Sequence, residues 1–145
     1  MIACEPAARA PLAAALRDGL PAISVPEAPT QALSIGTTVG SYRGVLAIRS
    51  TNGRSITLTD RQLHRARDAL SREGIWQELS GAAGVAGLRE LVEQGEGISG
   101  PVVCLATSSG FKDADSATGH PEPSFPVVTC WADIRRELAR APGSG

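Results

Sequence analysis

An α/β fold with a mostly parallel sheet is the fold class that the sequence predicts. Short strand-like runs alternate along the chain with helix-like segments, an order typical of strands joined by helical crossovers. The strongest strand signal is Val102–Ala106, an uncharged apolar run bounded by Gly and Pro on one side and a polar turn on the other, which is typical of a strand buried on both faces. The second is Arg54–Leu58, where Ile56 and Leu58 alternate with polar residues and a helix signal follows at Thr59.

Weaker signals fill the first third of the chain. Met1–Cys4 is short and apolar and is expected to form a strand, and Pro11–Arg17 is expected to form a short helix. Three prolines within Leu20–Thr30 exclude a long regular element there. Ser41–Arg49 is expected to be helical and to end at Asn52-Gly53.

The clearest helix signal covers Asp60–Arg72. Thr59 and Gln62 stand three apart like the hydroxyl and amide of a capping box. The expected apolar stripe consists of Leu63, Ala66 and Leu70, and the expected solvated face carries Arg61, Arg65, Arg67 and Arg72. His64 lies beside the stripe and is interpreted as a surface or boundary residue rather than a catalytic base.

A second helix is predicted over Gly81–Gln94, with Ser80 as its N-cap. Its first turns consist of small residues, which allow close approach to a sheet or a ligand, and Val85, Leu88 and Val92 are expected to continue its core face. The N-terminus of this helix is a weak candidate for binding an anion. Residues 114–130 have no periodicity and are expected to form a loop before a terminal helix, Trp131–Ala141.

Composition limits the classes of partner. The chain has 145 residues, enough for one domain with a real core, and 42% of them are hydrophobic although only 3% are aromatic. The formal net charge of −1 gives no electrostatic reason to expect nucleic acid or an anionic membrane as a partner. Of the 14 basic residues, all except Lys112 are arginines.

Cys4, Cys104 and Cys130 are odd in number and widely spaced, which favours buried thiols in a reducing compartment over a disulfide framework. Metal binding is not expected, because His64 and His120 are isolated and the sequence has no Cys-x-x-Cys pair. The first residues lack the basic region of a signal peptide and the uninterrupted apolar run of a membrane span, so a cytoplasmic location is expected.

The polar turn Thr107–Gly110 is the candidate ligand site, because it directly follows the strand predicted at Val102–Ala106. In open α/β sheets, ligands bind where strands end at their carboxyl edge. Hydroxyls and free backbone N–H groups gathered there suit a small anionic or heteroaromatic ligand. The alternative interpretation is a tight turn that merely leaves a core strand.

Four stretches, taken in order, carry a family resemblance: PTQALSIGTTVGSYRGVLAI, GRSITLTDRQLHRARDALSREGI, WQELSGAAGVAGLREL and VVCLATSSGFKD. Together they resemble the carboxyl-terminal part of threonine synthase and, more broadly, the pyridoxal-phosphate enzymes of fold type II, the tryptophan-synthase-β fold. The resemblance covers roughly residues 2–113. It implies a partial three-layer sandwich over residues 1–113, part of that family's large domain, followed by a carboxyl-terminal loop and helix over 114–145.

The resemblance also implies site residues. Thr107 matches the hydroxyl residue that bonds the pyridine nitrogen of the cofactor, and Glu78 and Ser80 match a helix-start motif near the ring. Ser108 departs from the pattern, because the family usually has Gly there. The family's Schiff-base lysine and Gly-rich phosphate loop have no counterpart, and Lys112 aligns with the Lys-Asp of the ring-binding motif, so no catalytic residue is assigned.

Three readings of the function follow. In the first, the chain is the carboxyl-terminal portion of a lyase that converts O-phosphohomoserine to threonine with pyridoxal phosphate, inactive alone and completed by an amino-terminal chain or by self-association. In the second, it is a non-catalytic binding module of the same fold. In the third, it is a non-functional truncated remnant. Threonine dehydratase-, cysteine synthase- and diaminopropionate-type relatives remain alternatives for the parent enzyme.

Overall fold

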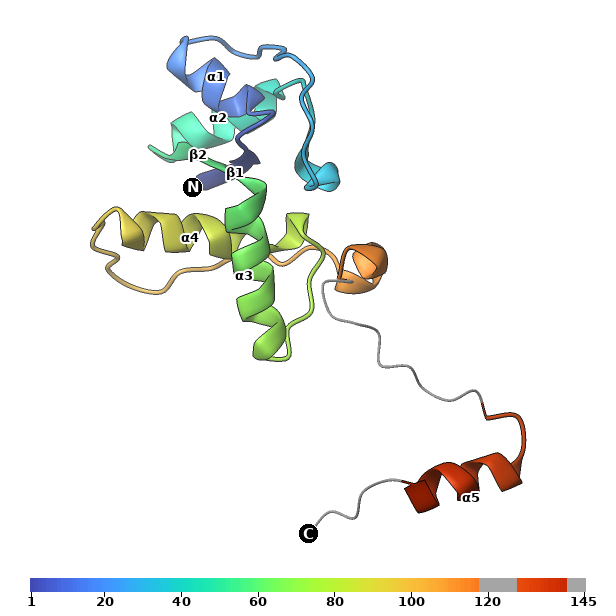
Figure 1. Ribbon diagram of the computed structural model, residues 1–145. Helices are drawn as coiled ribbons and strands as arrows, with labels where there is room; N and C mark the ends of the chain where they lie inside the picture. Colours follow the sequence, from blue (N-terminus) through green and yellow to red (C-terminus); the bar gives the residue numbers. More distant parts are fainter. Residues whose placement is uncertain (118–127, 141–145) are drawn as a thin grey trace. The chain divides into compact units, whose positions relative to one another are not determined.

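The computed structural model describes residues 1–117 and 128–140 of the chain (Figure 1). The chain forms two units, Met1–Ala114 and Asp115–Gly145, and each is described by itself. The first unit contains β1 (Ile2–Pro6), α1 (Pro11–Arg17), η1 (Leu33–Ile35), α2 (Tyr42–Ser50), β2 (Arg54–Leu58), α3 (Asp60–Arg72), η2 (Ser80–Ala82) and α4 (Ala83–Glu93). The 3₁₀ segment η3 (Gly110–Ala117) follows, and α5 (Trp131–Arg140) belongs to the second unit.

A parallel sheet of two strands, β1 and β2, forms the centre of the first unit. Ile2 lies opposite Arg54 and Pro6 lies opposite Leu58, and α1 and α2 lie in the crossover between the two strands. The helices α1 and α2 lie on one side of the strands and α4 lies on the other (Figure 1). The predicted α/β class with a parallel sheet and three layers is thereby confirmed.

Glu5 fixes α1 on the sheet. Its side chain is buried, and its two carboxylate oxygens accept hydrogen bonds at 2.8 Å from the backbone N–H groups of Leu12 and Ala13. The Ser55 hydroxyl, on β2, donates a third bond to Glu5 Oε2 at 2.8 Å. The first turn of α1 has no N-cap side chain of its own, so a carboxylate from the strand satisfies its free N–H groups.

Most of the predicted elements are confirmed. Pro11–Arg17, Arg54–Leu58 and Asp60–Arg72 have the predicted bounds, and α2 lies one residue later than predicted because Ser41 is its N-cap. At α3 the Thr59 hydroxyl accepts from Gln62 N, and Gln62 Oε1 accepts from Thr59 N, so the capping box is formed.

The core lies where α3, η2 and the first turns of α4 meet the end of β2. Its buried members are mostly small or branched aliphatic residues: Ala32, Leu58, Leu63, Ala66, Leu79, Ala82, Ala83 and Ala86. Leu63 and Ala66 confirm the predicted stripe of α3, and Leu70 packs against this core while partly exposed. The low aromatic content is therefore reflected in a core that contains no aromatic ring among these residues.

The other strand prediction, at Val102–Ala106, is wrong. Val102–Ala106 is not a strand: it has no regular secondary structure, and the exposed fractions of Val103 and Leu105 are 83% and 76%. A strand buried on both faces needs ladder partners and two covering layers. Neither β1 nor β2 pairs with this segment. Of the two covering layers, α4 provides one, through the contact of Gly84 with Cys104.

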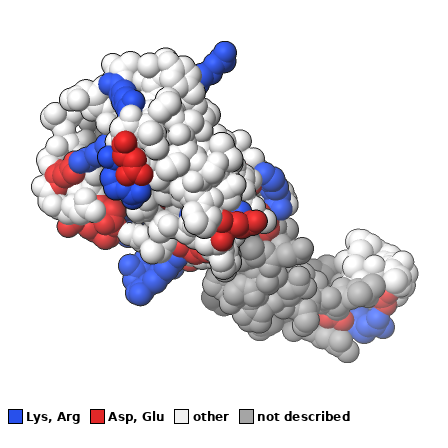
Figure 2. Space-filling view, turned by 90° about the horizontal axis from the view of Figure 1, so that it is seen from above, with Lys and Arg blue, Asp and Glu red and all other residues white. Residues whose placement is uncertain are grey.

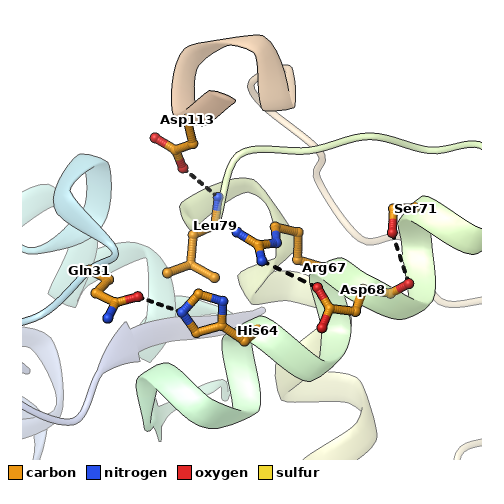
Figure 3. A network of polar contacts seen from close by, with 7 residues as sticks. All are labelled: Gln31, His64, Arg67, Asp68, Ser71, Leu79 and Asp113. Carbon is orange, nitrogen blue, oxygen red and sulfur yellow. Dashed lines mark hydrogen bonds and ion pairs between the residues drawn. The ribbon is translucent and has the colours of Figure 1, made fainter. Parts of the chain in front are cut away.

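Two predictions for the second helix are also wrong. Ser80 is not an N-cap, because it lies inside the 3₁₀ turn η2, while the carboxylate of Asp113 accepts from Leu79 N at 2.9 Å (Figure 3). Val92 is 58% exposed, and the buried face of α4 carries Ala83, Ala86, Gly87 and Leu91 instead. The buried face of α4 thus combines small residues with Leu91, and Val92 lies outside this face.

Three glycines spaced three residues apart, Gly81, Gly84 and Gly87, allow neighbouring segments to approach η2 and α4 closely. A Cβ built on Gly87 would lie 2.5 Å from Cys4 Sγ on β1, and one on Gly84 would lie 3.3 Å from Cys104 Cβ. A Cβ on Gly81, in η2, would lie 3.2 Å from the carbonyl oxygen of Ser108. The residue 101–108 segment and β1 therefore both lie directly against the same helical surface.

The remaining expectations concern the second unit. Helix α5 confirms the terminal helix, and Ile134 on it is partly buried. Residues 118–127 of the predicted loop, and Pro142–Gly145, lie outside the described residues. No helix within the described ranges has the length and apolar character needed to cross a bilayer.

The close contact at Gly87 leads to the first prediction. We expect Gly87→Ala to destabilise the chain by about 1–3 kcal/mol, because overpacking outweighs the roughly 1 kcal/mol by which alanine favours a helix. Urea unfolding followed by circular dichroism measures the change. In a Cys4→Ala background the same substitution should be neutral or stabilising, and Gly97→Ala, where a Cβ meets nothing within 4 Å, is the matched control. An equal loss with and without the Cys4 sulfur would contradict the prediction.

Candidate functional site

A hollow of the first unit lies between β1, α4 and residues 101–107. Its volume is about 700 Å³, and Ile2 and Cys4 from β1, Gly84 and Gly87 from α4, and Val103 and Leu105 are among the residues that line it. No residue that lines it has a charged side chain, and the only hydroxyl groups among the lining residues belong to Ser80 and Thr107. The hollow is therefore an apolar site with two hydroxyls, the composition typical of a site for a small organic ligand.

Thr107 and Ser80 reach this hollow from different elements. Thr107 ends the residue 101–107 segment and is exposed, whereas Ser80 begins η2 and is 7% exposed. Two backbone bonds hold these elements together: Glu78 N donates to Ser108 O at 3.1 Å, and Gly110 N donates to Trp76 O at 3.1 Å. The structure thus brings together two of the four site residues that the family resemblance indicates.

Ser108 serves a structural purpose in this arrangement. Its carbonyl accepts from Glu78 N, beside the antiparallel bridge between Gln77 and Ser109, and Ser108 does not line the hollow. Asn52 is the only non-glycine residue with a positive φ in the described part of the chain. Serine in place of the family's glycine therefore causes no left-handed backbone strain here.

Glu78, the fourth predicted site residue, lies in a buried polar cluster outside the lining of the hollow. Its carboxylate is 3% exposed, and its Oε2 atom lies 3.0 Å from Lys112 Nζ. The Ser34 hydroxyl lies 3.1 Å from the same oxygen and 2.7 Å from Lys112 Nζ. The only lysine of the chain is therefore held against a carboxylate and a hydroxyl and does not line the hollow.

A second polar network surrounds α3 (Figure 3). His64 Nε2 lies 2.5 Å from Gln31 Oε1, and Arg67 Nη2 lies 3.3 Å from Asp68 Oδ1. The side chain of Arg67 is only 13% exposed, so the predicted solvated face of α3 holds for Arg61, Arg65 and Arg72 but not for Arg67. His64 is a boundary residue, as predicted, and its ring also contacts the Gln31 side chain. On the face shown in Figure 2, acidic and basic side chains are interspersed rather than gathered by sign.

Sequence reasoning missed three features near the site. Cys4 and Cys104 both line the hollow, and burial, together with the neighbouring Cys104 and Glu5, raises the pKa of the Cys4 thiol to about 11. Among the buried side-chain oxygen and nitrogen atoms of the described residues, Gln77 Oε1 is the one without a hydrogen-bond partner. No local sequence signal indicates any of the three, because each depends on segments distant along the chain.

The family of the chain follows from comparison with known proteins. A parallel β-sheet between helices, with an apolar hollow that carries two hydroxyls, is compatible with a cofactor-binding α/β enzyme domain. The family model described as "Pyridoxal-phosphate dependent enzyme" matches residues 1–108. The chain belongs to this family.

Within it, the relatives named threonine synthase are similar to the chain. The protein from Methanosarcina acetivorans is 39% identical over 108 residues, which cover 71% of this chain and 27% of that protein. The protein from Methanocaldococcus jannaschii is 36% identical over 117 residues, covering 78% and 28%. A solved structure, the T.th. threonine deaminase, has 25% identity and a TM-score of 0.55, covering 64% of this chain and 30% of that one. The resemblance to threonine synthase is thus confirmed, and the chain spans little more than a quarter of the length of these curated relatives.

The family implies pyridoxal phosphate as the cofactor of the complete enzyme, and the described residues fit only part of it. An apolar hollow with the Thr107 and Ser80 hydroxyls suits the heteroaromatic ring. No amine side chain lines the hollow, and no cationic side chain lines it to hold a phosphate. Because this chain alone does not fit the whole cofactor, no chemical step through it is derived from these residues.

The ion pair of Lys112 leads to a stability prediction. Lys112→Met leaves the buried Glu78 carboxylate without its charged partner, and we expect a loss of about 1–2 kcal/mol, less than for a fully buried pair because Lys112 is half exposed. Urea unfolding at pH 7 measures it, with Arg43→Met, at an exposed position on α2, as the control. In a Glu78→Gln background the same substitution should cost less than half as much. An unchanged cost in that background would show that the pair does not act as a unit.

The raised pKa of Cys4 predicts its reactivity. Against a thiol at the ordinary value of 9.0, a pKa of about 11 makes the thiolate fraction below pH 9 about 100-fold smaller. We expect alkylation of Cys4 by iodoacetamide at pH 8 to be much slower than that of the exposed Cys130, and to accelerate about tenfold per pH unit while the pH stays below the raised pKa of about 11. Mass spectrometry of the two peptides provides the rates. A Cys4 rate that levels off below pH 9 would be inconsistent with the raised pKa.

Proposed function

We propose that this chain is a portion of a threonine-synthase-type, pyridoxal-phosphate-dependent lyase, and that it supplies the surface facing the cofactor ring. The complete enzyme would convert O-phosphohomoserine to threonine. The observation that carries the proposal is the apolar hollow with Thr107 and Ser80 at its polar end, in a chain 39% identical to a threonine synthase. Thr107 and Ser80 would bind the ring through neutral hydroxyls.

The chain alone is proposed to be inactive. Covalent catalysis with this cofactor requires a lysine amine aimed at the cofactor carbon. The only lysine, Lys112, lies 3.0 Å from Glu78 and does not line the hollow. The chain also covers only 27% of the length of the M. acetivorans relative, and the part of such a protein that this chain does not cover would supply the lysine and the phosphate loop. Inspection of the coding sequence upstream for these two features is a direct first check.

A second candidate is a deaminase of the same family. It is favoured by the similarity to the T.th. threonine deaminase, with a TM-score of 0.55. The two activities differ in their products: threonine is formed from O-phosphohomoserine by the first and is consumed to 2-oxobutyrate by the second. One preparation assayed for both reactions therefore separates the two candidates.

The test combines the full chain with the part of the M. acetivorans threonine synthase that the chain does not match, produced together in one host. We expect threonine formation from O-phosphohomoserine only when both polypeptides are present. Borohydride reduction of the chain alone with pyridoxal phosphate should leave Lys112 unmodified in peptide maps. Threonine formed by the chain alone would refute the proposed dependence on a second polypeptide.

Thr107 tests the role of the hollow in the combined preparation. Thr107→Val removes one hydroxyl without changing the side-chain volume, and loss of a hydrogen bond to the ring should lower kcat/KM about tenfold. The matched control is Thr37→Val, an exposed threonine outside the lining of the hollow, which should stay within about twofold of the unsubstituted preparation. Equal effects of the two substitutions would refute the proposed role of Thr107 in binding the ring.

A further inference from the structure

The edge of β1 that faces away from β2 is unpaired. Met1 O accepts from Arg54 N, and Ala7 N donates to Leu58 O, so the odd-numbered residues of β1 direct their backbone groups towards β2. Backbone groups alternate along a strand, so those of Ile2 and Cys4 point towards the opposite edge. No other strand pairs with β1 in the ranges that the structure describes, and Ile2 and Cys4 both line the hollow.

The opposite wall of the hollow is unpaired as well. Residues 102–106 make no backbone hydrogen bond within the described part of the chain, although they are continuous with the bonded turn at Ser108. Val102 and Val103 line the hollow with exposed fractions of 48% and 83%. An apolar segment with free N–H and C=O groups is what an unpaired strand edge presents.

Helix α4 forms a continuous floor beneath both walls. Gly87 contacts Cys4 on β1, and Gly84 contacts Cys104 on the 101–107 segment. The two walls therefore lie on one layer, as strands of one sheet do, with the hollow of about 700 Å³ lined by both of them and by this floor. Away from the polar end at Thr107 and Ser80, no lining side chain is charged or carries a hydroxyl, so this part of the hollow suits an apolar occupant. A helix, about 10 Å across, would leave the backbone groups of both walls unsatisfied.

From these three observations we infer that the hollow is a strand-acceptor groove, which receives one extended apolar segment of a second polypeptide. The segment would pair through its backbone with the free edge of β1 on one side and with residues 102–106 on the other, and it would lay its apolar side chains on α4. It would convert three separate segments into one continuous sheet.

The identity of the segment that fills the groove is inferred from the proposed function, and for this identity alone the inference rests on that function. The matched relatives carry close to three-quarters of their length outside the part that this chain covers. We therefore commit to a strand from the remaining portion of a threonine-synthase-type protein, rather than a second copy of this chain. A second copy filling its partner's groove is the competing outcome.

The probe is a set of overlapping 12-residue peptides that together cover the M. acetivorans threonine synthase. Binding of the labelled full chain should select one or a few peptides, rich in β-branched residues and outside the matched part. In solution, the selected peptide should slow hydrogen exchange at the amides of Ile2 and Cys4 and of residues 102–106. It should leave the exchange of α5 amides unchanged.

Two pairs of variants test the groove itself. Ile2→Lys places a charge on the β1 wall and should weaken peptide binding at least tenfold, whereas Leu33→Lys, at an exposed position outside the lining, should stay within twofold. Val102→Pro and Val103→Pro each remove one N–H, and adjacent N–H groups of an extended segment point to opposite sides. One proline should therefore weaken binding at least tenfold and the other should not. Unchanged circular dichroism shows that each variant is folded.

The outcomes are separable from those of the proposed function. Selective peptide binding with protection of both walls supports the groove even if no threonine is formed. Threonine formation without protection of β1 and residues 102–106, or equal binding by both proline variants, would overturn it. A dimer in sedimentation that Ile2→Lys dissociates, with no peptide selected, would also overturn it and assign the groove to a second copy.

Discussion

The close approach of backbone to α4 is the constraint on which the rest of the first unit depends. The absence of a side chain at Gly87, Gly84 and Gly81 allows the close approach of Cys4, Cys104 and the Ser108 carbonyl, respectively. One helical surface therefore fixes the positions of a strand, an extended segment and the polar turn. Any side chain at Gly87 would meet the sulfur at 2.5 Å. The hollow of about 700 Å³ lies over this surface, between β1 and the 101–107 segment.

The polar end of the hollow depends on a different set of bonds. Asp113 holds Leu79 N, and the backbone bonds of Glu78 to Ser108 and of Gly110 to Trp76 join the start of η2 to the end of the 101–107 segment. The ion pair of Glu78 with Lys112 lies beside these bonds, and neither residue lines the hollow. The four residues that the family resemblance places near one ring are thus divided: Thr107 and Ser80 line the hollow, whereas Glu78 and Ser108 hold the neighbouring segments together.

Local signals explain which parts of the fold are predictable from the sequence. The capping box at Thr59, the proline that starts α1 and the alternation of Arg54–Leu58 are complete within a few residues, and the bounds they predict are confirmed. The predictions for Ser80 and Val92 fail because both depend on contacts with distant segments: Asp113 accepts from the neighbouring Leu79 N, and the face of α4 that is buried excludes Val92. Cys4 and Cys104, one hundred residues apart, line the same hollow, and no pattern in either neighbourhood indicates it.

The failure at Val102–Ala106 has a physical cause of another kind. This segment has the composition of a strand buried on both faces, yet Val103 is 83% and Leu105 is 76% exposed. The described residues therefore cover only part of its apolar side chains. Full burial of a valine or leucine side chain stabilises by about 1.5–3 kcal/mol each. Covering these two would contribute roughly 3–6 kcal/mol, which is comparable to the whole net stability of many domains, about 5–15 kcal/mol. A segment that binds this groove would therefore also raise the unfolding free energy of the chain by mass action, so binding and folding stability are coupled at this one place.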